Sequence, residues 1–150
     1  MDDNASLALP DMSDEEQMEK NKNSLLAALK NIGAKRATVS YSGGGDSGYA
    51  DEVHIEGQDG TSMETVATVA QFAKEGFFLD GEWHKRVSVT EYPLTEALTG
   101  FSISALWHHH SGWENGEGGY GEVVFDPDGG KVCLRHNEYY VDTSSTEAVL

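Results

Sequence analysis

Three consecutive histidines, His108, His109 and His110, are the residues of this chain whose type best suits metal binding. Imidazole nitrogens bind transition metals, and a nearby carboxylate such as Glu114 would complete a mixed ligand set. Neighbouring side chains on an α-helix diverge by about 100°, so the three rings cannot all face one ion. The candidate ligands for a divalent metal are therefore His108 or His110 with Glu114, joined by His136. The competing interpretation is that protonated histidines end a helix, where the helix dipole favours positive charge.

A glycine-rich segment, Ser42-Gly43-Gly44-Gly45-Asp46-Ser47, could also do chemistry. It matches the SGGxDS pattern of PP-loop ATP pyrophosphatases, whose glycine N–H groups hold pyrophosphate. A phosphate loop should lead into a helix whose N-terminus faces the anion, but residues 48–55 have the pattern of a strand. Residues 37–73 also contain no Lys or Arg, so nearby carboxylates would repel a triphosphate unless metal ions intervened. A structural loop is therefore favoured over a nucleotide site.

A second glycine-rich segment, residues 112–121, contains Trp113, Glu114 and Asn115. The indole could serve as a platform for a ligand, and the Asn amide can both donate and accept hydrogen bonds. The alternative is that Trp113 covers the core and Asn115 occupies a turn, and this alternative is favoured.

The spacing His108-x-His110-x-x-x-Glu114, with Gly121 seven residues later, resembles the first metal motif of cupins. No matching glycine precedes His108, and the expected later histidine is absent. The residues before the histidines also have a helical pattern, whereas the cupin motif lies on strands. The resemblance to cupins therefore stops at this one motif.

The two glycine-rich segments together resemble a small bacterial domain family of unknown function, found in phage, plasmid and proteobacterial proteins. The resemblance rests on the Gly-Asp-Ser-Gly loop at 45–48, the acidic pair 51–52, the Gly-Trp-Glu-Asn-Gly loop at 112–116, and the hairpin ending at 136–138. It covers about residues 36–140. It implies a mobile-element or phage setting and no assigned activity.

Two helices and two hairpins are predicted to position these segments. Ser13 and Glu16 have the spacing of a capping box and begin a helix over 14–32. Pro93 suits the first turn of a second helix over 93–110. The two hairpins span 37–56 and 122–136, and the second contains the turn Asp126-Pro127-Asp128-Gly129-Gly130. The link 42–48 is too long for a tight hairpin, and the short apolar runs within 61–91 do not distinguish helix from strand.

These elements predict an α+β fold, with an antiparallel sheet built from hairpins and two helices packed on one face. The domain is expected over 13–141, between an acidic disordered tail at 1–12 and a flexible tail at 142–150. If the glycine-rich segments meet at one end of the sheet, they form a candidate contact site. Its residues are Asp46, Ser47, Glu52, Trp113, Glu114 and Asn115.

Composition excludes several classes of function. The 150 residues include 26 acidic and 10 basic ones, a formal net charge of −16, which disfavours direct binding to nucleic acid or to anionic membranes. No apolar run is long enough to span a bilayer. Cys133 is the only cysteine, so a disulfide within the chain and a cysteine-rich metal site are excluded. The acidic N-terminus lacks the features of a signal peptide, and a cytoplasmic location is expected.

Two classes of function remain open. The first is a non-enzymatic accessory or protein-interaction domain, an inhibitor or regulator whose negative charge would attract a basic, nucleic-acid-binding protein. The second is a metal-dependent or nucleotide-handling enzyme that uses the Asp46 and Ser47 loop together with His110 and Glu114. No cofactor is expected for the first class, whereas the second class could use a divalent metal.

Overall fold

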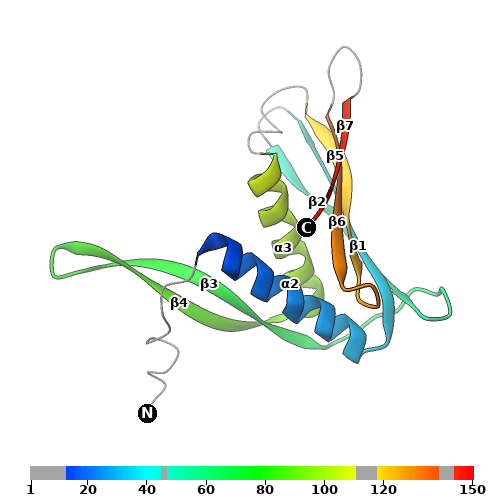
Figure 1. Cartoon of the computed structure of the whole chain (residues 1–150), viewed down its shortest axis with the longest axis horizontal. Helices are drawn as coiled ribbons and strands as arrows, with labels where there is room; N and C mark the ends of the chain where they lie inside the picture. Colours follow the sequence, from blue (N-terminus) through cyan, green and yellow to red (C-terminus); the bar gives the residue numbers. More distant parts are fainter. Residues whose placement is uncertain (1–12, 45–46, 111–117, 139–143) are drawn as a thin grey trace.

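A computed structural model of the chain describes residues 13–44, 47–110, 118–138 and 144–150 (Figure 1). The helices and strands, in chain order, are α2 (Asp14–Asn31), β1 (Ala34–Gly44), β2 (Ser47–Gly57), β3 (Thr68–Leu79), β4 (Glu82–Pro93), α3 (Leu94–His109), β5 (Gly119–Asp126), β6 (Lys131–Glu138) and β7 (Ser144–Val149). The expected tail at 1–12 lies outside the described residues.

Helix α2 begins with the capping box that the sequence predicts. The Ser13 hydroxyl accepts a hydrogen bond from the Glu16 backbone N–H at 3.0 Å, and the Ser13 N–H donates to the Glu16 carboxylate at 3.2 Å. One face of the helix carries Leu25 and Leu29, which are fully buried. The predicted helix over 14–32 is therefore confirmed.

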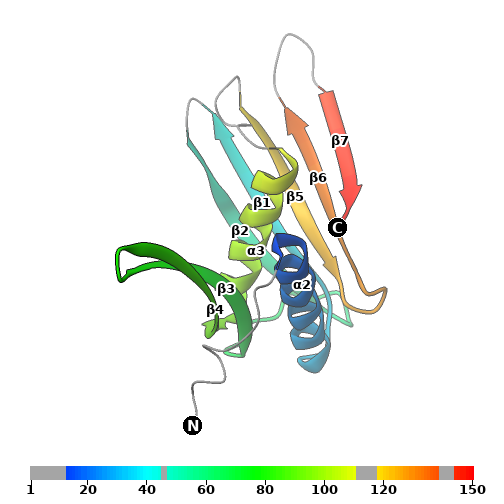
Figure 2. The same ribbon diagram turned by 60° about the vertical axis from the view of Figure 1, so that its left-hand side comes forward.

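Five strands form an antiparallel sheet in the order β2-β1-β5-β6-β7. Alternate residues of the three central strands, β1, β5 and β6, point toward the helices and are buried, as Val39, Phe125 and Leu134 illustrate. Both helices cover the same face of this sheet (Figures 1 and 2). The predicted α+β fold is confirmed: hairpins build the sheet, and the helices pack on one side.

The hairpin of β1 and β2 is tighter than the sequence predicts. The two strands pair through Gly43↔Gly48 and Gly44↔Ser47, so only residues 45–46 connect them. The prediction that 42–48 is too long for a tight hairpin is wrong, because most of its glycines pair as extended strand residues. The glycine-rich composition suggested a loop, but glycine can also occupy a strand.

Residues 68–93, most of the region whose secondary structure the sequence left open, form one long hairpin. Strands β3 and β4 pair without interruption from Thr68↔Pro93 to Leu79↔Glu82 and form a separate two-stranded sheet. The turn residues Asp80 and Gly81 have φ values of 54° and 80°. Two positive φ angles in a two-residue turn match the twist of a hairpin, and glycine adopts this conformation readily.

The C-terminal segment differs from the flexible tail expected at 142–150. Strand β7 pairs with β6 from Glu138↔Ser144 to Cys133↔Val149, and the Leu150 N–H donates to the Val132 carbonyl at 2.7 Å. This strand lies at the sheet edge and carries mostly polar residues. Backbone hydrogen bonds rather than apolar alternation define it, so its side-chain pattern did not indicate a strand.

Helix α3 agrees with the predicted range of 93–110 to within one residue at each end. Pro93 occupies the N-cap position instead of the first turn, so the helix begins at Leu94. Leu98 and Leu106 are fully buried against the sheet. Neither helix of the described residues has the length and apolar character needed to cross a membrane.

Candidate functional site

The hairpin of β3 and β4 is anchored to α2 at its base. The Asn21 amide accepts a hydrogen bond from the Phe72 N–H at 2.7 Å and donates one to the Phe72 carbonyl at 3.0 Å. Lys74 forms an ion pair with Asp14 at 3.0 Å. Farther along, residues 75–86 stand away from the five-stranded sheet and its helices (Figure 2). These residues are termed the arm.

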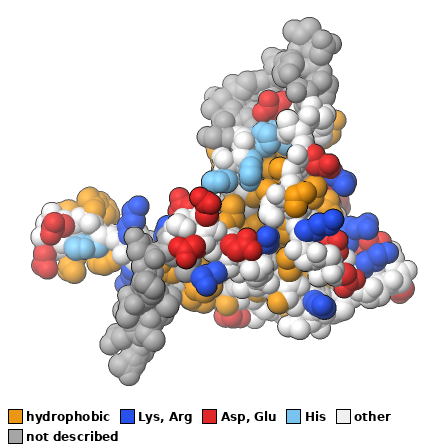
Figure 3. Space-filling model, in the orientation of Figure 1, with side chains coloured by type: hydrophobic (Ala, Val, Ile, Leu, Met, Phe, Trp, Pro, Cys, Tyr) orange, Lys and Arg blue, Asp and Glu red, His pale blue; other side chains and the backbone are white. Residues whose placement is uncertain are grey.

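The arm presents large apolar side chains to solvent. Trp83, Phe78 and Leu79 expose 75%, 60% and 52% of their surface. Phe78 and Trp83 face each other across the strands, with ring centroids 5.4 Å apart in an edge-to-face arrangement. On the neighbouring pair, Phe77 stacks on His84 at 5.4 Å. The arm therefore carries an apolar surface outside the core (Figure 3).

A cavity of about 740 Å³ lies beside the base of the arm, between α2 and α3. Its lining mixes polar side chains with apolar and aromatic ones, and the apolar and aromatic ones include Met18, Phe72, Tyr92, Phe101 and Trp107. Asp14 and Glu96 add carboxylates to the same lining. An apolar surface and acidic groups thus lie next to the arm.

A second region of interest is the end of the five-stranded sheet at which Gly43, Gly48, Gly119 and Glu138 lie. It is termed the sheet end. The strand register pairs Gly43 with Gly48 and with Gly119, which in turn pairs with Glu138. The C-terminus of α3 reaches this end of the sheet (Figure 1). Residues far apart in the sequence therefore meet here.

Gly121 on β5 is required for close packing at this end. A side chain at this position would collide with the Tyr41 hydroxyl and with the Arg135 carbonyl. The glycine thus leaves space for the Tyr41 ring, which is buried next to it. This close approach explains one glycine of the second glycine-rich segment.

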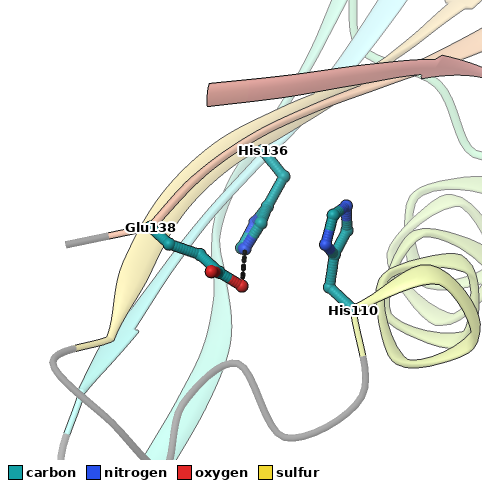
Figure 4. Close-up of side chains that lie close together, drawn as sticks. All are labelled: His110, His136 and Glu138. Atoms are coloured by element: carbon teal, nitrogen blue, oxygen red, sulfur yellow. Dashed lines mark hydrogen bonds and ion pairs between the residues drawn. The ribbon is translucent and has the colours of Figure 1, made fainter. Parts of the chain in front are cut away.

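His136 lies at the centre of the sheet end and exposes 1% of its surface. Its Nδ1 is 2.6 Å from the Tyr41 hydroxyl, and its Nε2 is 3.4 Å from Glu138 Oε1. The His110 ring lies against it, with centroids 4.2 Å apart. Figure 4 shows His136 and Glu138 from β6 and His110 from the end of α3 directed into one space. The imidazoles of His110 and His136 and the carboxylate of Glu138 thus lie close together, and the His136 ring is buried.

Burial changes the pKa values of His136 and Tyr41. Burial first, and positive charge on His110 second, hold the pKa of His136 below its ordinary value of 6.5, although Glu138 opposes the shift. Burial, with a smaller contribution from Glu138, raises the pKa of Tyr41 well above its ordinary range. Tyr41 therefore stays protonated at neutral pH, and the neutral form of His136 is favoured.

The structure brings together two of the four predicted metal ligands, His110 and His136. His108 lies elsewhere and lines the cavity between the helices, because successive side chains diverge around α3. Glu114 lies outside the described residues. Among the described residues, the carboxylate beside the two histidines is that of Glu138, which was not one of the predicted ligands. His136 and Glu138 share a strand face at i, i+2 spacing, and this spacing could have indicated the pair.

The histidines at the end of α3 were also expected to carry positive charge. The pKa of His109 is instead lowered by burial and by repulsion from His108 and His110. The favourable effect of the helix dipole is therefore opposed by the crowding of three imidazoles.

The six residues of the predicted contact site have different outcomes. Asp46, Trp113, Glu114 and Asn115 lie outside the described residues. Ser47 begins β2 at the sheet end, where its backbone pairs with Gly44. Glu52 is exposed and alternates with Val53 and Ile55, which point toward the helices. Glu52 therefore lies on the face of the sheet opposite His136.

Comparison with known protein families gives one match, a family of unknown function whose model covers residues 17–149. The chain belongs to the DUF6878 family. The matched span of this DUF6878 chain includes the arm, all of α3, every strand of both sheets, and α2 apart from its first three residues. The expectation of a family without an assigned function is confirmed. No curated protein and no solved structure matches the DUF6878 chain.

Proposed function

We propose that this DUF6878 domain acts by binding another protein through its arm. The observation that supports this proposal is the exposure of Trp83 and Phe78 on a hairpin that projects from the body. A two-stranded hairpin is marginally stable in water unless something packs against it. Exposed aromatic side chains are also enriched among the residues that dominate protein interfaces.

We propose further that the partner presents a basic surface beside an apolar one. The exposed first turns of α2 carry Asp14, Glu15, Glu16 and Glu19, and Lys74 ties this end of α2 to the base of the arm. Acidic side chains gather beside the arm in Figure 3. A partner bound to the arm would lie near these carboxylates. Positive charge on the partner would then speed and orient the association.

A nucleic-acid-binding protein has the basic surface that this arrangement requires. The proposed role is that of an accessory or inhibitory domain, which occupies such a surface and competes with nucleic acid for it. The phage or mobile-element setting suggested by the sequence resemblance is compatible with that role.

Capture from a cell extract tests this function. The immobilised full chain should retain a basic protein that a Phe78→Ala, Trp83→Ala double variant does not retain. Val66→Ala is the matched control, because Val66 is fully exposed but lies outside the arm. Raising the salt concentration should weaken capture, because salt screens charge attraction. Equal capture by the double variant would overturn the role of the arm, and capture insensitive to salt would overturn the basic partner.

A further inference from the structure

We propose that His110, His136 and Glu138 form a binding site for one divalent transition-metal ion, with Zn²⁺ the best match. The site lies at the sheet end and is independent of the arm and its partner. One potential ligand atom from each residue lies within 4.8 Å of the other two.

The spacing of the donor atoms is close to that of a metal site. A tetrahedral ion with bonds of about 2.0–2.2 Å holds its ligand atoms about 3.3–3.5 Å apart. His136 Nε2 and Glu138 Oε1 are already 3.4 Å apart, which is long for a hydrogen bond between them. His110, at the end of α3, therefore needs the largest adjustment for the three atoms to surround one ion.

The environment of His136 resembles that of a ligand imidazole. A metal-bound histidine usually donates its second ring N–H to a polar group, which fixes the ring and its tautomer. The Tyr41 hydroxyl is 2.6 Å from Nδ1 and can accept such a hydrogen bond. The same hydroxyl is 3.5 Å from the Arg135 carbonyl, which can accept its proton. With Nδ1 protonated in this way, Nε2 presents a lone pair toward Glu138 and His110.

His110 has a comparable arrangement. Its Nε2 lies 3.2 Å from the Thr146 hydroxyl on β7, which leaves Nδ1 as the nitrogen available for an ion. Its backbone N–H donates to Leu106 at 2.7 Å, so the end of α3 fixes the position of the residue. Each histidine thus has one ring nitrogen directed to a hydroxyl group, and its other ring nitrogen faces the proposed site (Figure 4).

The donor set selects the class of metal. Two imidazoles and one carboxylate suit Zn²⁺ and related transition ions, whereas Mg²⁺ and Ca²⁺ prefer oxygen ligands. Three protein ligands leave at least one coordination position for water or another ligand. Tyr41 contacts a ligand but not the ion, and is therefore a positioning residue.

Metal titration of the full chain, prepared without a histidine tag and treated with chelator, tests the site. Calorimetry should show one Zn²⁺ per chain, and Co²⁺ should give the visible absorption of a tetrahedral site. His110→Ala and Glu138→Gln should each weaken Zn²⁺ binding about tenfold or more. His108→Ala, on the same turn of α3, and Glu122→Gln, on β5, are matched controls that should bind normally. Tyr41→Phe should weaken binding about 10- to 100-fold while keeping one ion per chain.

Several results would overturn the site. One is the absence of Zn²⁺ binding at one equivalent by the folded chain, as judged by circular dichroism. Another is normal binding by both His110→Ala and Glu138→Gln. Equal weakening by His108→Ala would indicate capture by the surface histidine run, and displacement of Zn²⁺ by equimolar Mg²⁺ would contradict the donor set.

Discussion

On the arm, Trp83 exposes 75% of its surface, whereas His136 at the sheet end exposes 1%. Both side chains lie on antiparallel strands, but their surroundings differ. Backbone pairing between two strands positions Trp83, and neither α2 nor α3 covers it. Strands β1 and β6 and the end of α3 position His136, through contacts with Tyr41, Glu138 and His110.

This difference separates the two regions in function. An exposed hairpin can adjust to a partner at little cost to the fold, which suits protein binding. A buried ring with a defined hydrogen-bond partner holds its geometry, which suits a small ligand such as an ion. Substitutions on the arm should therefore change binding alone, whereas substitutions near the sheet end should also change stability.

The largest effect on stability should come from Phe125→Ala. Phe125 is fully buried on β5 and packs edge-to-face on Phe101, with centroids 5.8 Å apart. Removing the ring leaves a cavity and should lower the free energy of unfolding by about 3–5 kcal/mol. Urea denaturation measures this loss. A change below about 1 kcal/mol would mean that the sheet and helices are not the main source of stability.

Tyr41→Phe should have the next largest effect. It removes the hydroxyl that lies 2.6 Å from His136 Nδ1 and leaves a buried polar atom with one partner fewer. The expected loss is about 1–3 kcal/mol in the free energy of unfolding of the metal-free chain. An unchanged denaturation midpoint would show that this hydrogen bond does not stabilise the sheet end.

The lowered pKa of His136 predicts that stability depends on pH. The unfolded chain binds a proton at this residue more readily than the folded chain does. The free energy of unfolding should therefore decrease as the pH falls below the ordinary value of 6.5, until the lowered pKa is passed. Urea denaturation of the metal-free chain at about pH 7.5 and about pH 5.5 measures the trend.

A His136→Gln chain should lose this part of the pH dependence, because its side chain does not titrate. The Trp83→Ala chain, altered only on the arm, should keep it. An equal dependence in the His136→Gln chain would assign the trend to other groups.

The smallest effect on stability should come from Trp83→Ala. The indole lies on the arm and is largely exposed, so its loss should change the free energy of unfolding by less than about 0.5 kcal/mol. Denaturation with urea, monitored by circular dichroism, provides the measurement. A loss as large as that for Tyr41→Phe would show that the arm is part of the cooperative fold.

The sequence predicted the elements whose patterns are local. The capping box at Ser13 located α2, and alternation located the hairpins of the main sheet. The arm was not predicted, because short apolar runs such as 77–79 fit a helix or a strand equally well. Strand β7 was not predicted either, because its polar residues lie at an edge and show no apolar alternation.

The sheet end was predicted only in part, because its residues are distant in sequence. His110 and His136 were both candidates, but their proximity depends on where α3 ends relative to β6. The addition of Glu138 as a partner required the strand face shared with His136, and the position of Tyr41 required the strand register. Residue types therefore suggested a metal site, whereas the fold was needed to show which of these side chains lie together.

The most direct test of the separation between the two regions compares two double variants of the full chain in both binding assays. The Phe78→Ala, Trp83→Ala chain should lose the captured protein and keep one Zn²⁺ per chain. The His110→Ala, Glu138→Gln chain should do the opposite and lose Zn²⁺ while keeping the captured protein. Loss of both activities in either folded variant would contradict the separation of the two regions, because it would place partner binding and metal binding in one site.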